Sequence, residues 1–340
     1  MKEHREVNIL SESMGDNILE VRNLRTSFHT NNGIVKAVND VSFDVKKGEV
    51  LGIVGESGCG KSVTAFSITQ LVPSPGEIEG GNVFYDLNGQ KTDLAKFGKY
   101  SKEMRSVRGS EISVVFQEPM TAFNPVYTIG NQIKEVMLLH ENISKKEARK
   151  RTIELINKVG ISAPEQRVDE YPHQLSGGMR QRAMIAMALA GNPKLLIADE
   201  PTTALDVTIE AQILDLMRDL QKSEDMSIIM ITHDLGVIGE MSDRVLVMYL
   251  GQVIESSPAD DLFYDPKHPY TEGLLDSIPL ISPGRKERLR PIKGNVPDPR
   301  LVKKGCPFRD RCPKEMDVCS QKPPKIEINK DHYVKCWLYK

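Results

Sequence analysis

Apolar positions along the chain fall into short runs separated by glycines and charged residues. Residues 18–54 contain the segments ILEVRNL, VKAVNDVSFDV and VLGIV, with a turn at 47–49 before the last of them. Two further aliphatic runs, LLIA at 195–198 and SIIMIT at 227–232, are flanked by segments of helical pattern. Such runs predict short strands buried on both faces, as in a parallel sheet. The segment RVLVMYLGQVIES predicts a closing hairpin around Gly251.

A mainly helical insertion is expected between the first strands and the later ones. Ser-Lys-Lys-Glu at 144–147 is a capping box, which predicts the start of a helix that ends at Gly160. The segments 128–140 and 180–190 also have helical patterns. Together they make residues 117–190 mostly helical. Helices alternating with buried strands indicate the α/β class.

Composition sets broad limits on the protein. The chain has 340 residues, of which 39% are hydrophobic and 27% charged, with a formal net charge of −2. These values are ordinary for a globular protein and give no bias toward nucleic acid. No apolar run approaches the length of a membrane-spanning helix, and the first residues lack the apolar region of a signal peptide. We therefore expect the protein on the cytoplasmic side.

A phosphate-binding loop is the first chemical motif. Residues 55–62, Gly-Glu-Ser-Gly-Cys-Gly-Lys-Ser, match G-x-x-x-x-G-K-[ST] between an apolar strand and a predicted helix at 61–71. Backbone N–H groups and the helix N-terminus favour phosphate there, Lys61 neutralises the β- and γ-phosphates, and Ser62 binds Mg²⁺. Cys59 is interpreted as a small filler and not as a nucleophile. The loop residues expected to bind ATP are Gly55, Ser57, Gly58, Cys59, Gly60, Lys61, Ser62 and Val63.

Acidic and histidine side chains follow the two later strands. Asp199 and Glu200 come directly after LLIA, and adjacent strand residues point to opposite sides, so the two acids should have different roles. Asp199 would hold Mg²⁺ through water, and Glu200 would act as general base on the attacking water. The alternative is a simple helix N-cap. His233 follows SIIMIT and would face the same γ-phosphate.

With these motifs in this order, residues 18–258 resemble an ATP-binding cassette (ABC) ATPase. The resemblance adds Gln117 as the Q-loop residue, 175–179 (Leu-Ser-Gly-Gly-Met) as the signature, and 204–206 (Ala-Leu-Asp, with Asp206) as the D-loop. It implies that Gln117 senses Mg²⁺ and the γ-phosphate. Phe28 is the aromatic residue expected to stack on adenine, with an ordinary core phenylalanine as the alternative.

The resemblance also implies an ATP-sandwich dimer. In the family, the signature closes over ATP held by the opposite subunit, so Ser176, Gly177 and Gly178 would act on a partner's nucleotide. Met179 departs from the commonest signature, which has Gln there, but the phosphate-facing residues are kept. The implied fold has a RecA-like parallel-sheet core, an antiparallel β-subdomain, a helical signature subdomain and a small Cys-rich C-terminal appendage. The expected division is 1–17 (extension), 18–258 (nucleotide-binding domain), 259–305 (C-terminal extension and linker) and 306–340 (Cys-rich tail).

A narrower resemblance concerns the transported substrate. Residues 118–130, 267–275 and 305–313 resemble the ATPase subunits of oligopeptide and dipeptide importers. This resemblance implies a second, related ATPase, two membrane permeases and an external substrate-binding protein as partners, at the cytoplasmic face of the membrane. Family members also import nickel and oligosaccharides, which stay open as alternatives. A non-transport ABC ATPase is less expected, because no long coiled coil or second cassette is present.

Four of the five cysteines lie near the C-terminus, at 306, 312, 319 and 336. Four thiolates suit tetrahedral Zn²⁺ or an iron–sulfur cluster. The importer resemblance implies a [4Fe–4S] cluster on Cys306, Cys312, Cys319 and Cys336, with Zn²⁺ and free or disulfide-bonded cysteines as alternatives. The basic stretch 285–314 is most simply a solvated linker, although a contact with anionic lipid or the partner ATPase is open.

Overall fold

The structure is a computed structural model, and it describes residues 14–203, 205–278, 292–302 and 304–340. Three expectations therefore fall partly outside the described residues. They concern the N-terminal extension up to residue 13, Ala204 of the D-loop, and the linker at 279–291 with Lys303.

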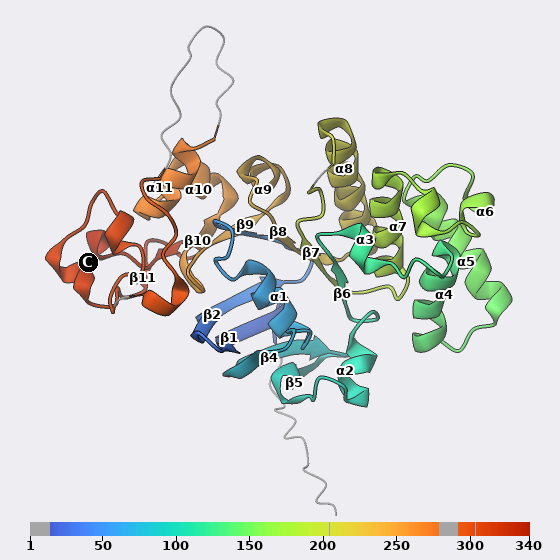
Figure 1. The fold of residues 1–340 in the computed structure, drawn as a ribbon, viewed down its shortest axis with the longest axis horizontal. Helices are drawn as coiled ribbons and strands as arrows, with labels where there is room; N and C mark the ends of the chain where they lie inside the picture. The colour runs from blue at the N-terminus through green and yellow to red at the C-terminus, as the bar shows by residue number, and fades with distance from the viewer. Residues whose placement is uncertain (1–13, 204, 279–291, 303) are drawn as a thin grey trace, which may run out of the picture.

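The larger sheet carries the parallel core (Figure 1). Among the described residues its strand order is β11-β12-β10-β9-β3-β8-β7-β6, and the pairs from β9 to β6 are all parallel. The runs expected as buried strands form β3, β7 and β8. Their bounds, with those of their parallel neighbours, are β3 Val50–Val54, β6 Ile112–Val115, β7 Leu195–Asp199, β8 Ser227–Ile231 and β9 Arg244–Tyr249.

A hairpin closes this sheet as the sequence predicted. β10 (Gln252–Pro258) pairs antiparallel with β9, and Gln252 lies opposite Tyr249. Leu250 and Gly251 between them both have positive φ, the conformation that a tight hairpin turn requires.

The first strands form a separate antiparallel sheet, ordered β2-β1-β4-β5. The strands are β1 Asn17–Thr30, β2 Gly33–Lys46, β4 Gly76–Leu87 and β5 Gln90–Asp93. A hydrogen bond between Thr26 Oγ1 and Ser67 Oγ (2.7 Å) joins β1 to helix α1 (Lys61–Ile68). This helix ends three residues before the expected Leu71.

Two apolar cores lie on opposite faces of the parallel sheet. Leu51 and Ile53 of β3 pack with α1 and the antiparallel sheet, whereas Val50 and Val54 belong to the core on the other face. That second core includes residues of α8 (Val207–Glu224) and α9 (Leu235–Met241). The alternation along one short strand is the period of two that a strand buried on both faces requires.

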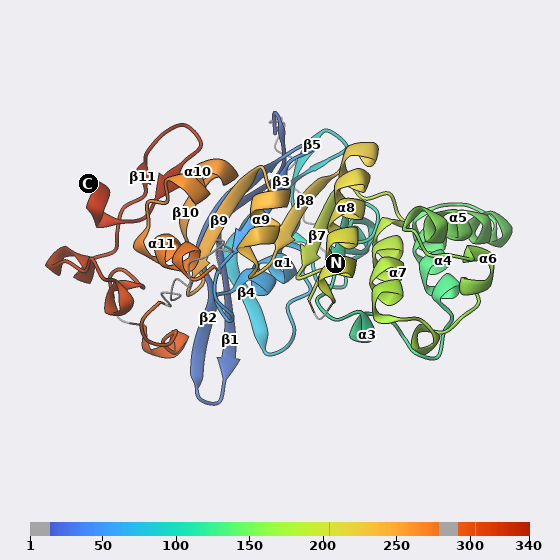
Figure 2. The same ribbon diagram turned by 90° about the horizontal axis from the view of Figure 1, so that it is seen from above.

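Residues 117–190 are mainly helical, as predicted, and lie at the β6 end of the sheet (Figures 1 and 2). Ser144 caps α5 by accepting a hydrogen bond from the Glu147 N–H (3.2 Å), and Gly160 follows the helix with φ +75. Preceded by α2 (Lys102–Val107), the helices of this segment are α3 Pro119–Ala122, α4 Ile129–His140, α5 Lys145–Lys158, α6 Pro164–Arg167 and α7 Gly177–Leu189.

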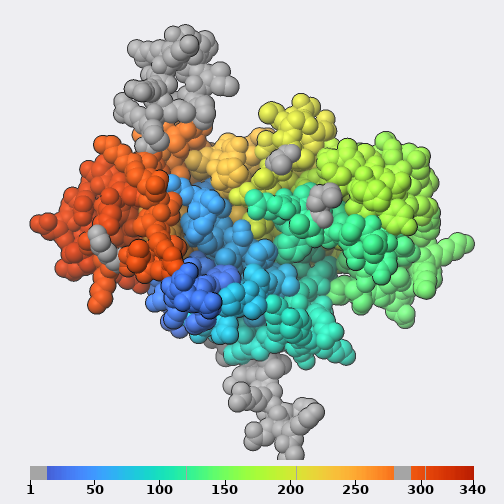
Figure 3. Space-filling model, in the orientation of Figure 1, coloured from blue at the N-terminus to red at the C-terminus, as the bar shows by residue number. Residues whose placement is uncertain are grey.

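The C-terminal residues lie at the opposite end of the molecule and pack directly on the rest of the chain (Figures 1 and 3). Two short strands, β11 (Ile326–Glu327) and β12 (Tyr333–Val334), extend the larger sheet beyond β10. Helices α10 (Ala259–Tyr264) and α11 (Pro269–Asp276) precede them. The tail is therefore continuous with the main sheet through hydrogen-bonded strands.

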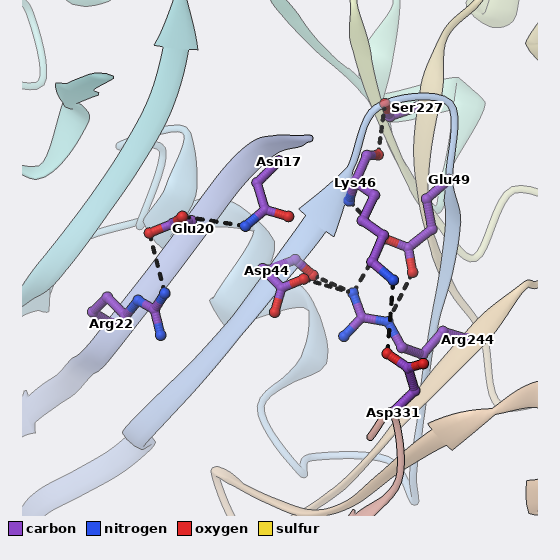
Figure 4. Close-up of polar contacts among 9 residues, drawn as sticks. All are labelled: Asn17, Glu20, Arg22, Asp44, Lys46, Glu49, Ser227, Arg244 and Asp331. Carbon is purple, nitrogen blue, oxygen red and sulfur yellow. Dashed lines mark hydrogen bonds and ion pairs between the residues drawn. The ribbon is translucent and has the colours of Figure 1, made fainter. Parts of the chain in front are cut away.

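A largely buried arginine joins the two sheets (Figure 4). The Arg244 guanidinium donates to both carboxylate oxygens of Glu49 (2.8 and 3.1 Å) and to the Asp44 carboxylate (3.1 Å). Glu49 in turn accepts a hydrogen bond from the Lys46 N–H (2.6 Å). Because Arg244 starts β9 while Asp44 and Lys46 lie on β2, the network fixes the antiparallel sheet against the parallel one.

Candidate functional site

The phosphate loop lies between β3 and α1, where the motif requires it. Gly60 has φ +100, and a Cβ there would lie 2.1 Å from the Ala37 carbonyl oxygen. Gly55 is similarly enclosed, because a Cβ would lie 2.2 Å from the Met248 carbonyl oxygen. Side chains cannot be accommodated at either position, so the glycines are set by close backbone approach.

Lys61 is folded back onto this loop. Its Nζ donates to the carbonyl oxygens of Gly55 (2.7 Å) and Glu56 (3.3 Å) and lies 3.9 Å from the Cys59 sulfur. Cys59 itself is buried, and burial raises the pKa of its thiol above the ordinary value. A buried thiol with a raised pKa is a poor nucleophile, as expected for a packing residue.

Ser62 and Asp199 meet across the loop. The Ser62 hydroxyl donates to Asp199 Oδ1 at 3.0 Å. Burial raises the pKa of Asp199, and the hydrogen bond from Ser62 partly opposes that rise. A hydroxyl and a carboxylate in contact beside a phosphate loop are hard oxygen ligands of the kind that Mg²⁺ prefers. The residues present thus fit the magnesium site that the sequence predicted.

The Glu200 carboxylate has three polar partners that Asp199 does not share. Its carboxylate accepts hydrogen bonds from Gln117 Nε2 (2.8 Å) and Thr203 Oγ1 (2.9 Å), and Oε1 lies 3.2 Å from His233 Nδ1. Its backbone has φ +48, which is rare for a residue other than glycine. Strained backbone of this kind concentrates at functional sites. The structure thus brings Gln117, Glu200 and His233 together, from three separate parts of the chain.

The signature residues lie in a different cavity. Ser176 caps α7 by accepting from the Met179 N–H (3.3 Å), and a Cβ at Gly177 would meet no atom within 4 Å. A cavity of about 390 Å³ is lined by Ser176, Gly177, Gly178 and Asp206, among others, and by no residue of the phosphate loop. Asp206 also caps α8 through the Ile209 N–H (3.0 Å). The signature and the phosphate loop of one chain therefore do not line the same cavity.

Phe28 lies on β1 with a partly exposed side chain. Its Cε1 would be 2.7 Å from a Cβ at Gly76, so the ring packs against the start of β4. This placement is compatible with both the adenine-stacking role and the ordinary packing role that the sequence left open.

The four C-terminal cysteines are free thiols. The Cys306 N–H donates to the Cys319 carbonyl oxygen (2.9 Å), and burial is the main cause that raises the pKa of Cys306 to about 11. The described residues nevertheless contain no group of three or more His, Cys, Asp or Glu side chains close enough to hold a metal ion. The expected four-cysteine ligand set for a [4Fe–4S] cluster or Zn²⁺ is therefore not formed in this structure. Spacing along the sequence places the thiols in one region, but in the described residues it does not assemble three or more of them into a metal site.

Several site residues were missed by the sequence analysis. Thr203 could have been found, because it stands three residues after Glu200, which is the separation that a turn brings together. Glu56 places a negative charge in a loop that is assigned to phosphate binding. This unfavourable charge was the signal in the sequence that a compensating, positively charged partner should lie nearby. Its partners Tyr270 and Arg311 are too distant in sequence for any local pattern to reveal them.

Comparison with known proteins identifies the family of the chain. A model described as ABC transporter matches residues 38–203, and one described as oligopeptide/dipeptide transporter, C-terminal region, matches residues 254–319. The chain is 53% identical to the oligopeptide transport ATP-binding protein AppD of Bacillus subtilis (strain 168), over 95% of this chain and 97% of the relative. The chain belongs to the ABC transporter ATP-binding proteins of the oligopeptide/dipeptide branch.

Other relatives of this ABC protein support the same placement. The dipeptide transport ATP-binding protein DppD of Bacillus subtilis (strain 168) is 50% identical over 95% of each chain. A dimeric post-hydrolysis structure of the ATP-binding cassette MJ0796, bound to ADP and Pi, has a TM-score of 0.62 and 28% identity, covering 71% of this chain and 98% of that one. The expected fold class is thereby confirmed. Among the described residues, no helix is both long and apolar enough to cross a membrane.

Proposed function

We propose that this chain binds and hydrolyses ATP to energise the import of oligopeptides or dipeptides. The observation that carries the proposal is the meeting of Gln117 and His233 on the Glu200 carboxylate, beside the Ser62–Asp199 contact at the phosphate loop. The names of the similar proteins AppD and DppD support peptides as the substrate class.

ATP binding is assigned to the loop at 55–63, with Gln117, Asp199 and Phe28. Backbone N–H groups at the start of α1 and the Lys61 ammonium group bind the phosphates. Lys61 would exchange its bonds to the loop carbonyl groups for phosphate oxygens. Phe28 is assigned to the adenine ring.

Magnesium is assigned to Ser62, Asp199 and Gln117, with Asp199 acting through water. When bound, Mg²⁺ neutralises charge on the β- and γ-phosphates. Ser62 and Asp199 already lie in hydrogen-bond contact, so these two ligands are brought together before the ion binds.

Glu200 is assigned as the general base. Gln117 and Thr203 donate to one carboxylate oxygen, Oε2, and His233 contacts the other. Oε2 uses both of its lone pairs on these two donors, whereas Oε1 keeps one lone pair, so Glu200 can still accept a proton from water at Oε1 while its orientation is fixed. His233 is assigned to contact the γ-phosphate.

The test is Glu200→Gln. This variant keeps the shape of the side chain but removes the base, so we expect ATP binding and ATP-dependent dimerisation to persist while steady-state phosphate release falls by about 10²-fold or more. Glu154→Gln, on the exposed face of α5, is the matched control and should hydrolyse ATP normally. Near-normal turnover in Glu200→Gln would refute the base assignment.

The active assembly is proposed to be a head-to-tail ATP sandwich with a second, related ATPase. Support comes from the separate signature cavity, where Ser176, Gly177, Gly178 and Asp206 line a space that excludes the chain's own phosphate loop. Two membrane permeases and, indirectly, an extracellular substrate-binding protein complete the proposed importer, with this chain peripheral at the cytoplasmic face. Affinity purification from membranes should recover both permeases and the second ATPase. Recovery of a homodimer alone would contradict the heterodimer.

Two finer assignments remain part of the proposal. The division into 1–17, 18–258, 259–305 and 306–340 rests on motif positions and pattern. The [4Fe–4S] cluster rests on the number and spacing of the cysteines, and no step above depends on it. Anaerobic purification with iron and sulfide assays tests the cluster, and a colourless, iron-free protein would reject it.

A further inference from the structure

Glu56 places a carboxylate inside the loop assigned to the phosphates of ATP. Its backbone carbonyl accepts from Lys61 Nζ (3.3 Å), so the residue belongs to the same small structure as the phosphate-binding lysine. A carboxylate at this position repels a triphosphate unless its charge is neutralised. The negative charge of Glu56 must therefore be compensated by another group.

The compensating charge comes from the C-terminal tail. Arg311 donates from Nη1 to Glu56 Oε2 (2.6 Å) and from Nη2 to Oε1 (3.0 Å), a bidentate pair across 255 positions of sequence. The Arg311 side chain is 6% exposed. The hydrogen bonds to Glu56 are the largest cause that raises the pKa of this guanidinium above its ordinary value.

The rest of the Arg311 side chain is also held in place. Its Nε donates to the Lys293 carbonyl oxygen (3.1 Å), Nη2 to that of Gly294 (3.3 Å), and Nη1 contacts the Tyr249 hydroxyl (3.4 Å). These hydrogen bonds involve Nε, Nη1 and Nη2. They therefore fix the orientation of the guanidinium independently of its contact with Glu56.

A second contact from the C-terminal region fixes the backbone of the same residue. The Glu56 N–H donates to the Tyr270 hydroxyl of α11 at 2.8 Å. Tyr270 packs with Tyr249 and Phe308 in an aromatic cluster whose ring centroids lie 4.7 to 5.3 Å apart. Phe308 stands three residues before Arg311 and is buried, so it anchors the segment that carries the arginine.

We propose that Arg311 is a positioning residue for ATP binding, which neutralises and orients Glu56 so that the phosphate loop presents no uncompensated negative charge. The inference rests on the proposed ATPase function and deepens it. Through Arg311 and Tyr270, the C-terminal tail and α11 control the affinity of the nucleotide site.

The experiment is a double-mutant cycle on Arg311 and Glu56 in the full chain. We expect Arg311→Gln to raise the Kd for ATP and the KM by about tenfold with kcat changed less than about twofold, because Glu56 is left unpaired. Glu56→Gln on that background removes the repelling charge and should return the Kd to within about twofold of the wild type. Arg311→Lys should be intermediate, and the penalty in Arg311→Gln should shrink as salt is raised.

Arg309→Gln is the matched control, because Arg309 lies in the same short helix but contacts Asp310 and not Glu56. A double variant as weak as Arg311→Gln, with no salt dependence, would overturn the inference and leave Arg311 a purely structural residue. Glu56→Gln alone keeps the test open if Arg311→Gln does not fold, since it should bind ATP at least as well as the wild type. A wild-type chain without ATPase activity in its assembled transporter would instead refute the proposed function.

Discussion

At the scale of single residues, the site depends on backbone positions as much as on side chains. Gly60 and Gly55 are enclosed by carbonyl oxygens, and Glu200 is held at φ +48 while its carboxylate contacts Gln117 and His233. The residue types could be predicted from the sequence, since the loop motif demands glycines. The left-handed backbone conformation of Glu200 could not be predicted from the sequence, because no local pattern requires it.

Gly60→Ala tests the enclosed backbone. A Cβ at 2.1 Å from the Ala37 carbonyl oxygen must displace β2 or the loop, so we expect ATP affinity to fall by more than about tenfold. Equilibrium ATP binding measures the change. Gly89→Ala is the control, because Gly89 also has positive φ (+81) but open space around it. Equal ATP affinity in both variants would contradict the requirement for glycine that the close approach imposes at Gly60.

At the scale of elements, the strands were predicted where apolar runs are continuous, as in β3, β7 and β8. β1 was predicted only in its first half, because its second half, from Arg25 to Thr30, is largely polar. The continuation of the sheet through β12 was not expected, since a two-residue strand has no readable period. Pairings between distant elements, such as Arg311 with Glu56, depend on the assembled fold and escape any local pattern.

Arg244→Ala tests how the two sheets are joined. Removing the guanidinium leaves the Glu49 carboxylate buried without its partner, so we expect a loss of about 3 kcal/mol in the free energy of unfolding. Urea unfolding of the purified chain measures it. Arg22→Ala removes an exposed arginine from Glu20 on β1, which keeps Lys91 and Asn17 as partners, so it should cost less than about 1 kcal/mol. Comparable losses in both variants would contradict a special role for the buried network.

At the scale of the whole molecule, the C-terminal region is secured by a buried polar cluster. The Glu255 carboxylate on β10 accepts from the His268 N–H (2.9 Å) and the Thr271 hydroxyl (2.6 Å) and contacts His332 Nε2 at 2.9 Å. Burial raises the pKa of Glu255, but these hydrogen bonds outweigh burial and hold it below the ordinary value. The carboxylate thus remains charged and joins α11 and the tail to the sheet.

His268 in this cluster predicts a pH-dependent stability. Burial lowers its pKa from 6.5 to about 4, and its Nδ1 must stay unprotonated to accept from the Tyr270 N–H (3.0 Å). Between pH 6.5 and about 4, the His268 side chain binds a proton in the unfolded chain but stays unprotonated in the folded chain. The free energy of unfolding should therefore fall by up to roughly 1.4 kcal/mol per unit as pH drops from 6.5 toward 4.

Thermal unfolding midpoints across this pH range measure the effect. His268→Asn keeps a side-chain acceptor for the cap of α11 but does not titrate, so its midpoint should decline less steeply. Parallel declines in the two proteins would assign the pH dependence to other groups. The fall attributable to Glu255 belongs below its ordinary pKa of 4.5, because a depressed carboxyl pKa loses its stabilisation only in acid.

The short strand β12 has a consequence for how the molecule avoids self-association. It hydrogen-bonds along β10 at Glu255 and Ser256, so it covers a strand whose open N–H and C=O groups would otherwise template pairing between copies. The last strand of the sheet in the described residues, β11, spans two residues and offers little length for such pairing. A chain truncated after β10 would expose that edge. The tail therefore protects the sheet against aggregation and also contacts the phosphate loop.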